Sequence, residues 1–232
     1  MPAMIEISDA EKAFTMHLQG GIRLPVVRGV SFQVDAGECV VLAGPSGAGK
    51  SSILKMIFGN YRCDGGRIGI RHGGALLDIA KAEPRDVLRV RRDTIGYVSQ
   101  FLRAVPRVPT IDVVAEPLIA TGTPREAARE QAGNLLRCLN IPERLWTLPP
   151  STFSGGEQQR VNIARGLIAA HPVLLLDEPT AALDAANRQA VIALIEAARQ
   201  AGAAIIGIFH DREVREAVGT RIFDMTRPET AA

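Results

Sequence analysis

The chain has 232 residues, 47% of them hydrophobic and 22% charged, which is typical of a single α/β domain of generous size. Its formal net charge of +2 is too balanced to predict a nucleic-acid-binding or membrane-surface protein. The 3 cysteines form no CxxC pair, which argues against a disulfide framework and a zinc site. Residues 1–14 do not resemble a signal peptide, and no stretch approaches the ~18 apolar residues of a membrane span. These features predict a cytoplasmic protein.

Apolar patterning predicts an α/β fold with an antiparallel β subdomain at the N-terminus. Residues 5–34 and 66–80 alternate between apolar and polar side chains, as antiparallel strands joined by tight turns do. Three short apolar runs, CVVLAG from Cys39, PVLLLDEP from Pro172 and AAIIGIFHD from Ala203, predict buried parallel strands. Helical patterns separate these runs, as expected for a parallel sheet whose two faces are covered.

Two further helical regions follow from the sequence. Residues 101–150 carry early prolines and then helical spacing, which predicts a helical insertion between two core strands. Asp184 is expected to cap a helix that ends near Gly202 and has an apolar face made of Val191, Leu194, Ile195 and Ala198. We therefore expect one domain, 1–232, with a core at about 1–100 and 161–232 and a helical subdomain at about 101–160.

The stretch GPSGAGKSS directly follows the first apolar run and precedes a helical pattern. It fits the phosphate-binding pattern G-x-x-x-x-G-K-[ST] in the strand–loop–helix context that this pattern requires. We expect Lys50 to contact the β- and γ-phosphates of a nucleotide and Ser51 to bind Mg²⁺. The predicted nucleotide-binding residues of this loop are Gly44, Pro45, Ser46, Gly47, Ala48, Gly49, Lys50, Ser51 and Ser52.

The stretch VLLLDEP places two carboxylates at the end of a predicted buried strand. Asp177 could help to hold Mg²⁺, and Glu178 could serve as the base or orienter for attacking water. Alone, the pair is equally well explained as a solvated strand end. Together with the phosphate loop, it predicts binding and hydrolysis of a nucleoside triphosphate.

A second glycine-rich helix start, FSGGE, needs a separate explanation. Ser154 and Glu157 have the spacing of a capping box, which is sufficient to begin a helix. Capping does not require Gly155 and Gly156, and each costs about 1 kcal/mol relative to alanine in a helix interior. Their missing side chains are explained if an anion approaches the exposed N–H groups of the first turn. A helix start without a ligand is the alternative.

Taken in order, GPSGAGKSS, the SQ ending at Gln100, FSGGEQQR, LLLDEPTAALD and His210 resemble an ATP-binding-cassette (ABC) ATPase along nearly the whole chain. The resemblance implies a P-loop NTPase parallel-sheet core with an N-terminal antiparallel β subdomain and an inserted helical subdomain. It also implies that two ATP molecules lie between two cassettes, each bound by one phosphate loop and by the partner's Ser154–Gly156. Phe153 departs from the leucine common in this family, and Glu157 stands where many members have glutamine.

The resemblance implies roles for four further residues. Gln100 is similar to the residue that senses Mg²⁺ and the attacking water, and His210 to the switch histidine that contacts the γ-phosphate. Asp184 is similar to the residue through which two subunits communicate. Phe14 matches the aromatic residue that stacks on adenine, although an ordinary core phenylalanine explains it equally well.

Stretches outside the ATP motifs, such as HLQGGIRLPV, YVSQFLRAVPR and IPERLWTLPP, are similar to the L subunit of the bacterial carbon–phosphorus lyase system. This resemblance implies an accessory ATPase in phosphonate breakdown. Its partners would be a second copy or a related K-type cassette, and a soluble lyase core complex. The alternative is the motor subunit of a membrane transporter of the lipoprotein-release or macrolide-export type, with a transmembrane permease as partner; FSGGEQQR is similar to these.

A chromosome or DNA-repair ATPase is not expected, because the chain has no long coiled-coil insertion and no zinc module. The arginines between Arg85 and Arg92 are not interleaved with aromatic residues. They therefore predict a solvated face or a protein-docking surface, and we expect no nucleic-acid partner.

Overall fold

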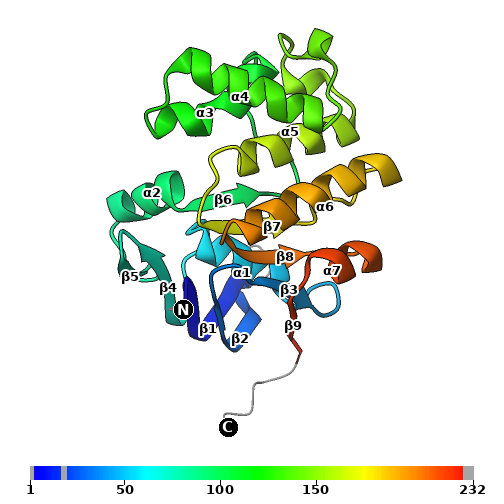
Figure 1. Ribbon diagram of the computed structural model, residues 1–232. Coiled ribbons are helices and arrows are strands. Elements are labelled where there is room, and N and C mark those ends of the chain that lie inside the picture. The colour runs from blue at the N-terminus through cyan, green and yellow to red at the C-terminus, as the bar shows by residue number, and fades with distance from the viewer. Residues whose placement is uncertain (1–2, 17–19, 227–232) are drawn as a thin grey trace.

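The computed structural model describes residues 3–16 and 20–226 and contains two sheets of different type. Figure 1 shows three layers, with helices α3, α4 and α5 at the top, a parallel sheet in the middle and an antiparallel sheet below it. Residues 17–19, which begin the stretch HLQGGIRLPV, lie outside the described residues. This arrangement confirms the predicted α/β fold class.

The central sheet is parallel throughout and has the strand order β6-β7-β8-β3-β9. The runs beginning at Cys39, Pro172 and Ala203 form its three adjacent inner strands, as predicted. The bounds of the five strands are β3 Cys39–Ala43, β6 Ile95–Val98, β7 Val173–Asp177, β8 Ala204–Ile208 and β9 Arg221–Asp224.

Successive residues of these strands point to opposite faces, and each face has its own apolar core. Val41 and Leu174 belong to the cluster that contains α3, α4, α5 and α6. Val40 and Leu175 belong to the cluster on the other side, which contains α1 and the antiparallel sheet. The parallel sheet is therefore buried on both faces, which explains its almost uninterrupted apolar sequence.

The antiparallel sheet has the order β2-β1-β4-β5 and confirms the alternation seen in the sequence. Its strands are β1 Ile5–Met16, β2 Ile22–Val34, β4 Gly65–His72 and β5 Ala75–Asp78. The core helices are α1 Lys50–Ile57, α2 Pro84–Asp93, α6 Ala185–Gln200 and α7 Arg212–Val218. Asp184 caps α6 by accepting a hydrogen bond from the N–H of Asn187, so this predicted cap is confirmed.

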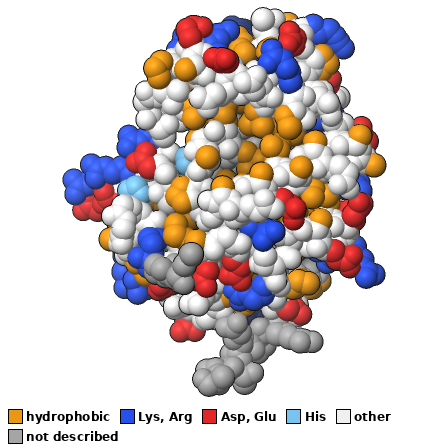
Figure 2. Space-filling model, in the orientation of Figure 1, with side chains coloured by type: hydrophobic (Ala, Val, Ile, Leu, Met, Phe, Trp, Pro, Cys, Tyr) orange, Lys and Arg blue, Asp and Glu red, His pale blue; other side chains and the backbone are white. Residues whose placement is uncertain are grey.

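The helical layer consists of α3 Thr110–Ala120, α4 Arg125–Cys138 and α5 Gly155–Leu167, with single 3₁₀ turns at Glu143–Leu145 and Pro150–Thr152. On the face drawn in Figure 2, apolar side chains gather around α5, between the helical layer and α6. Among the described residues, no helix is long and apolar enough to cross a bilayer.

Helix α5 and strand β6 approach each other through two glycines. A Cβ added to Gly96 would overlap the carbonyl oxygen of Gly166, and one added to Gly166 would lie 2.5 Å from Cγ2 of Val98. This close approach holds α5, and with it the helical layer, directly against the edge of the parallel sheet.

We predict that Gly96→Ala lowers the free energy of unfolding by about 1–3 kcal/mol, because the added methyl group forces two backbones apart. Thermal unfolding followed by circular dichroism measures the effect. Gly155→Ala is the matched control, since a Cβ on Gly155 meets no atom within 4 Å. Equal stability of the two variants would show that the contact between α5 and β6 is not tight.

Candidate functional site

The phosphate loop joins β3 to α1 at the carboxyl end of the parallel sheet. Gly49 has φ +88°, and a Cβ there would lie 2.6 Å from the carbonyl oxygen of Val26, so only glycine fits without strain. The ammonium group of Lys50 donates hydrogen bonds to the carbonyl oxygens of Gly44 and Pro45, at 2.7 and 2.9 Å. The side chain of Lys50 therefore lies over the loop in which the phosphates are predicted to bind.

Ser51 and Asp177 come together at the start of α1 and the end of β7. The Ser51 hydroxyl donates to Oδ1 of Asp177 at 2.9 Å, and the Tyr97 hydroxyl lies 3.4 Å from Oδ2. Burial raises the pKa of the Asp177 carboxyl, and the hydrogen bond from Ser51 opposes this shift. Helix α1, through Ser51, and strand β6, through Tyr97, thus each orient one oxygen of this carboxylate.

A hydroxyl and a carboxylate are oxygen ligands of the kind that Mg²⁺ prefers. Within the described residues, no group of three or more His, Cys, Asp or Glu side chains could hold a metal ion. Ser51 and Asp177 would hold a bound Mg²⁺, which would supply neutralisation of phosphate charge.

Glu178 is the centre of a polar cluster at the same edge of the sheet. Its Oε1 lies 2.7 Å from Nε2 of His210, and its Oε2 accepts a hydrogen bond from Nε2 of Gln100 at 3.3 Å. Glu178 has φ +54°, an uncommon conformation for this residue type, and its N–H is bound to the carbonyl oxygen of Ile208. The structure thus brings all three predicted catalytic residues together.

The helix start at FSGGE has the predicted capping box. The Ser154 backbone N–H and hydroxyl both donate to Oε2 of Glu157, at 2.9 and 2.7 Å, and these bonds lower the pKa of the Glu157 carboxyl. Gly155 has open space around it, so no contact within the chain requires glycine there, and its role in binding a ligand stays a prediction. Gly156 has an internal reason as well, because a Cβ there would lie 3.0 Å from the carbonyl oxygen of Ala182.

Asp184 is exposed at the N-terminus of α6 and is hydrogen-bonded to Asn187. The backbone N–H of Asn187 donates to its Oδ1 at 2.8 Å, and this bond is the largest cause of a lowered pKa for the Asp184 carboxyl. Asn140, two residues beyond the end of α4, donates to Oδ1 of Asn187 at 3.1 Å. The segment after α4 therefore contacts Asn187, which in turn binds Asp184.

Phe14 lies on β1 with its ring edge-on to Tyr61, at 5.2 Å between ring centroids. The ammonium of Lys12 lies 5.4 Å from the centroid of the same ring. The phenylalanine is only partly buried, so it is not enclosed by the core. Its predicted stacking on adenine stays a prediction.

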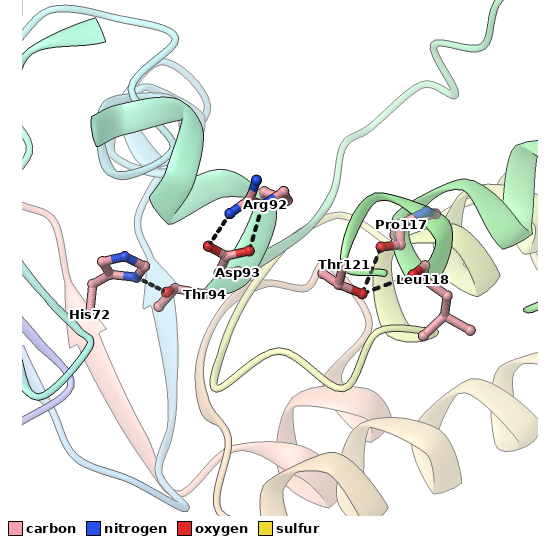
Figure 3. A network of polar contacts seen from close by, with 7 residues as sticks. All are labelled: His72, Arg92, Asp93, Thr94, Pro117, Leu118 and Thr121. Carbon is pink, nitrogen blue, oxygen red and sulfur yellow. Dashed lines mark hydrogen bonds and ion pairs between the residues drawn. The ribbon is translucent and has the colours of Figure 1, made fainter. Parts of the chain in front are cut away.

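A cleft of about 990 Å³ lies between α2 and α3, beside β6, and Asp177 is among its lining residues. Figure 3 shows the two walls from close by: Arg92 pairs with Asp93 at the end of α2, and opposite them Thr121 donates to the carbonyl oxygen of Pro117 at the end of α3. The lining also includes Leu88, Arg91, Tyr97, Gln100, Phe101 and Arg165.

The arginines of α2 have nearby acidic partners. Arg85, Arg89 and Arg92 form ion pairs with Glu83, Asp86 and Asp93 respectively. Arg91 donates to the carbonyl oxygen of Phe58 and stacks over its ring. Arg85, Arg89 and Arg92 are exposed, and a docking role for them stays a prediction.

Sequence reasoning missed the side chains that join α5 to the catalytic loops. Gln159 donates to the carbonyl oxygen of Pro179, and Asn162 donates to that of Ser99. Both are buried, with 6% and 4% exposure. A buried amide inside the apolar pattern VNIARGLIAA was the available signal, since a buried polar group requires a partner.

The ABC transporter family model matches residues 27–181. The chain belongs to the ABC transporter family. It is similar to the lipoprotein-releasing system ATP-binding protein LolD 2 of Caulobacter vibrioides, with 41% identity over 82% of each protein. It is also similar to the macrolide export ATP-binding/permease protein MacB of Rhodospirillum rubrum, with 37% identity over 92% of this chain but 32% of MacB.

Solved ABC cassettes share the fold. A dimeric structure of the cassette MJ0796 in a post-hydrolysis state, bound to ADP and Pi, has a TM-score of 0.85 and 28% identity, and the match covers 95% of this chain and 94% of that one. The predicted ATPase activity and family are therefore confirmed. The finer similarity to the carbon–phosphorus lyase L subunit is not supported by these relatives, whose names favour the transporter alternative.

We predict that Glu178→Gln keeps ATP binding but lowers ATP turnover at least about 100-fold, because an amide cannot accept the proton of the attacking water. Phosphate release gives the rate, and binding of a fluorescent ATP analogue gives the affinity. Glu213→Gln is the control, since Glu213 lies on α7 and is paired with Gln189 outside this cluster. Turnover at the wild-type rate in Glu178→Gln would contradict the assignment of the base.

Proposed function

We propose that this ABC ATPase is the ATP-driven subunit of a two-cassette assembly. The observation that carries the proposal is the convergence of Gln100 and His210 on the two carboxylate oxygens of Glu178, beside the Ser51–Asp177 pair. In this proposal, the cluster around Glu178 orients the attacking water, and the Ser51–Asp177 pair beside it would hold Mg²⁺. This is the arrangement that phosphoryl transfer to water requires.

In the proposed reaction, the phosphate loop and Lys50 hold the β- and γ-phosphates of ATP. Glu178 accepts a proton from the water that attacks the γ-phosphorus, while Gln100 positions that water and His210 contacts the γ-phosphate. Both residues bond to Glu178, so they lie beside the carboxylate that accepts the proton in this proposal. The products are ADP and inorganic phosphate.

The signature turn at Ser154–Gly156 supplies the second half of each site in the proposed assembly. Ser154 and Gly155 are exposed, and open space surrounds Gly155. The relative MJ0796 is dimeric in two solved structures. ATP held between two such surfaces stabilises the pair, and loss of the γ-phosphate allows the two cassettes to separate.

We predict that Gly155→Asp leaves the ATP affinity of the isolated monomer within about twofold and abolishes hydrolysis that depends on association. A carboxylate in that open space repels the partner's phosphates but does not contact the chain's own phosphate loop. ATP binding to dilute protein and ATPase activity as a function of protein concentration give the two readouts. Lost binding by the monomer would assign Gly155 to its own chain's site.

For the partner of the pair, the relatives favour a transmembrane permease. LolD is named as part of a lipoprotein-releasing system, and MacB as an export ATP-binding/permease protein. The cleft beside β6 gives such a partner a place to dock, with Phe101 at 74% and Leu88 at 61% exposure. In this proposal the cassette works at the cytoplasmic side of a membrane without entering it.

A second candidate is the soluble carbon–phosphorus lyase assembly, paired with a K-type cassette. The observation that favours it is the stretch YVSQFLRAVPR, which is similar to the L subunit and provides several lining residues of this cleft. Motifs that bind ATP are shared by the whole family, so they do not identify the partner. The side chains that line the cleft are not part of the shared ATP motifs, so they can distinguish one partner from another.

Affinity purification of the full chain from its native cells distinguishes the two candidates. We expect a multispanning permease in the first case and phosphonate-lyase subunits in the second. Phe101→Asp is predicted to lose the partner without losing ATP binding, because it places a charge on an exposed apolar contact. Ile222→Asp is the control, since Ile222 is similarly exposed, at 66%, but lies on β9 at the opposite edge of the sheet. Equal partner recovery in both variants would remove the cleft as the docking site.

A further inference from the structure

Helix α5 holds the loop between β6 and α3 at two points. Asn162 donates through Nδ2 to the carbonyl oxygen of Ser99, at 2.5 Å. One turn further along the helix, Arg165 donates through Nη1 to the carbonyl oxygen of Arg103, at 3.2 Å. Segment 99–103, called here the clamped loop, is therefore attached to α5 near both of its ends.

The clamped loop carries two residues with different surroundings. Gln100 reaches Glu178, at 3.3 Å between Nε2 and Oε2. Phe101 lines the cleft and is 74% exposed. A hydrogen bond from the Ser99 hydroxyl to the Phe101 carbonyl oxygen, at 2.8 Å, tightens the turn between them. The exposed ring of Phe101 and the side chain of Gln100 therefore belong to the same short, hydrogen-bonded turn.

Asn162 has a different relation to the loop from Arg165. Asn162 is 4% exposed, and its amide donates to the carbonyl oxygen of Ser99, the residue directly before Gln100. Arg165 also forms an ion pair with Glu116 of α3, at 3.2 Å, and is partly exposed. A buried amide bonded to a backbone carbonyl defines one position of that carbonyl, whereas an exposed arginine can adjust.

We propose that Asn162 is a positioning residue for Gln100. Its buried amide fixes the carbonyl oxygen of Ser99, and Gln100 is the next residue of the chain. This inference rests on the proposed role of Gln100.

The test compares Asn162→Asp, Asn162→Ala and Gln100→Ala in the full chain. Asn162→Asp keeps the side-chain volume but cannot donate the bond, and it presents a carboxylate to a carbonyl oxygen. We expect its kcat for ATP to fall about tenfold or more, with affinity for a fluorescent ATP analogue changed less than about twofold. Asn162→Ala retains helix propensity and is expected to show a smaller loss of the same kind.

A double-mutant cycle with Gln100→Ala separates positioning from general destabilisation. We expect Asn162→Ala to lower kcat in the wild-type background and to have no further effect when Gln100 is absent. Multiplicative losses in the double variant, or a normal kcat in both Asn162 variants, would overturn the proposal. Asn134→Ala is the control, an amide deletion on the exposed side of α4, and it should leave kcat unchanged.

Failure of the positioning role can be distinguished from unfolding and from failure of the proposed hydrolytic site. If Asn162→Asp unfolds at the assay temperature, the cycle with Asn162→Ala decides the question alone. If Glu178→Gln turns over ATP normally, the proposed hydrolytic site is wrong. If Glu178→Gln is inactive while both Asn162 variants are normal, only the positioning role fails.

Discussion

The parallel pairing of β7 with its two neighbours is the constraint on which the site depends. Val173–Asp177 is buried along its whole length between β6 and β8. Because the carboxyl ends of parallel strands meet at one edge, this pairing brings Tyr97, Asp177 and His210 to the same place. A register shift of one residue would turn Asp177 into the opposite core, so the apolar contacts on both faces of the sheet also define the catalytic geometry.

The second organising element is α5, which contributes to three regions at once. Its N-terminus forms the signature turn, its buried face bonds to the loops that carry Gln100 and Glu178, and Arg165 pairs with Glu116 of α3. Its close approach to β6 through Gly96 and Gly166 leaves little freedom to slide. The position of α5 relative to the edge of the parallel sheet is therefore closely defined.

The parts of the site that sequence could predict are those defined by local chemistry. The phosphate loop, the capping box at Ser154 and the polar ends of apolar strands each depend on residues that are adjacent in the chain. The contacts of Asn162 with Ser99 and of Gly156 with Ala182 join segments distant in sequence, so no local pattern defines them. The partner is hardest to predict, because exposed side chains such as Phe101 contribute nothing to folding and follow no periodic rule.

The close contact between Gly156 and the carbonyl oxygen of Ala182 has a consequence for a paired assembly. The signature turn and the segment leading to Asp184 touch backbone to backbone, with no side chain between them to absorb a displacement. One chain therefore offers its neighbour a single stiff surface that contains both elements. In the proposed pair, an ATP molecule held by the neighbour's phosphate loop would therefore meet the signature turn and the Asp184 segment together.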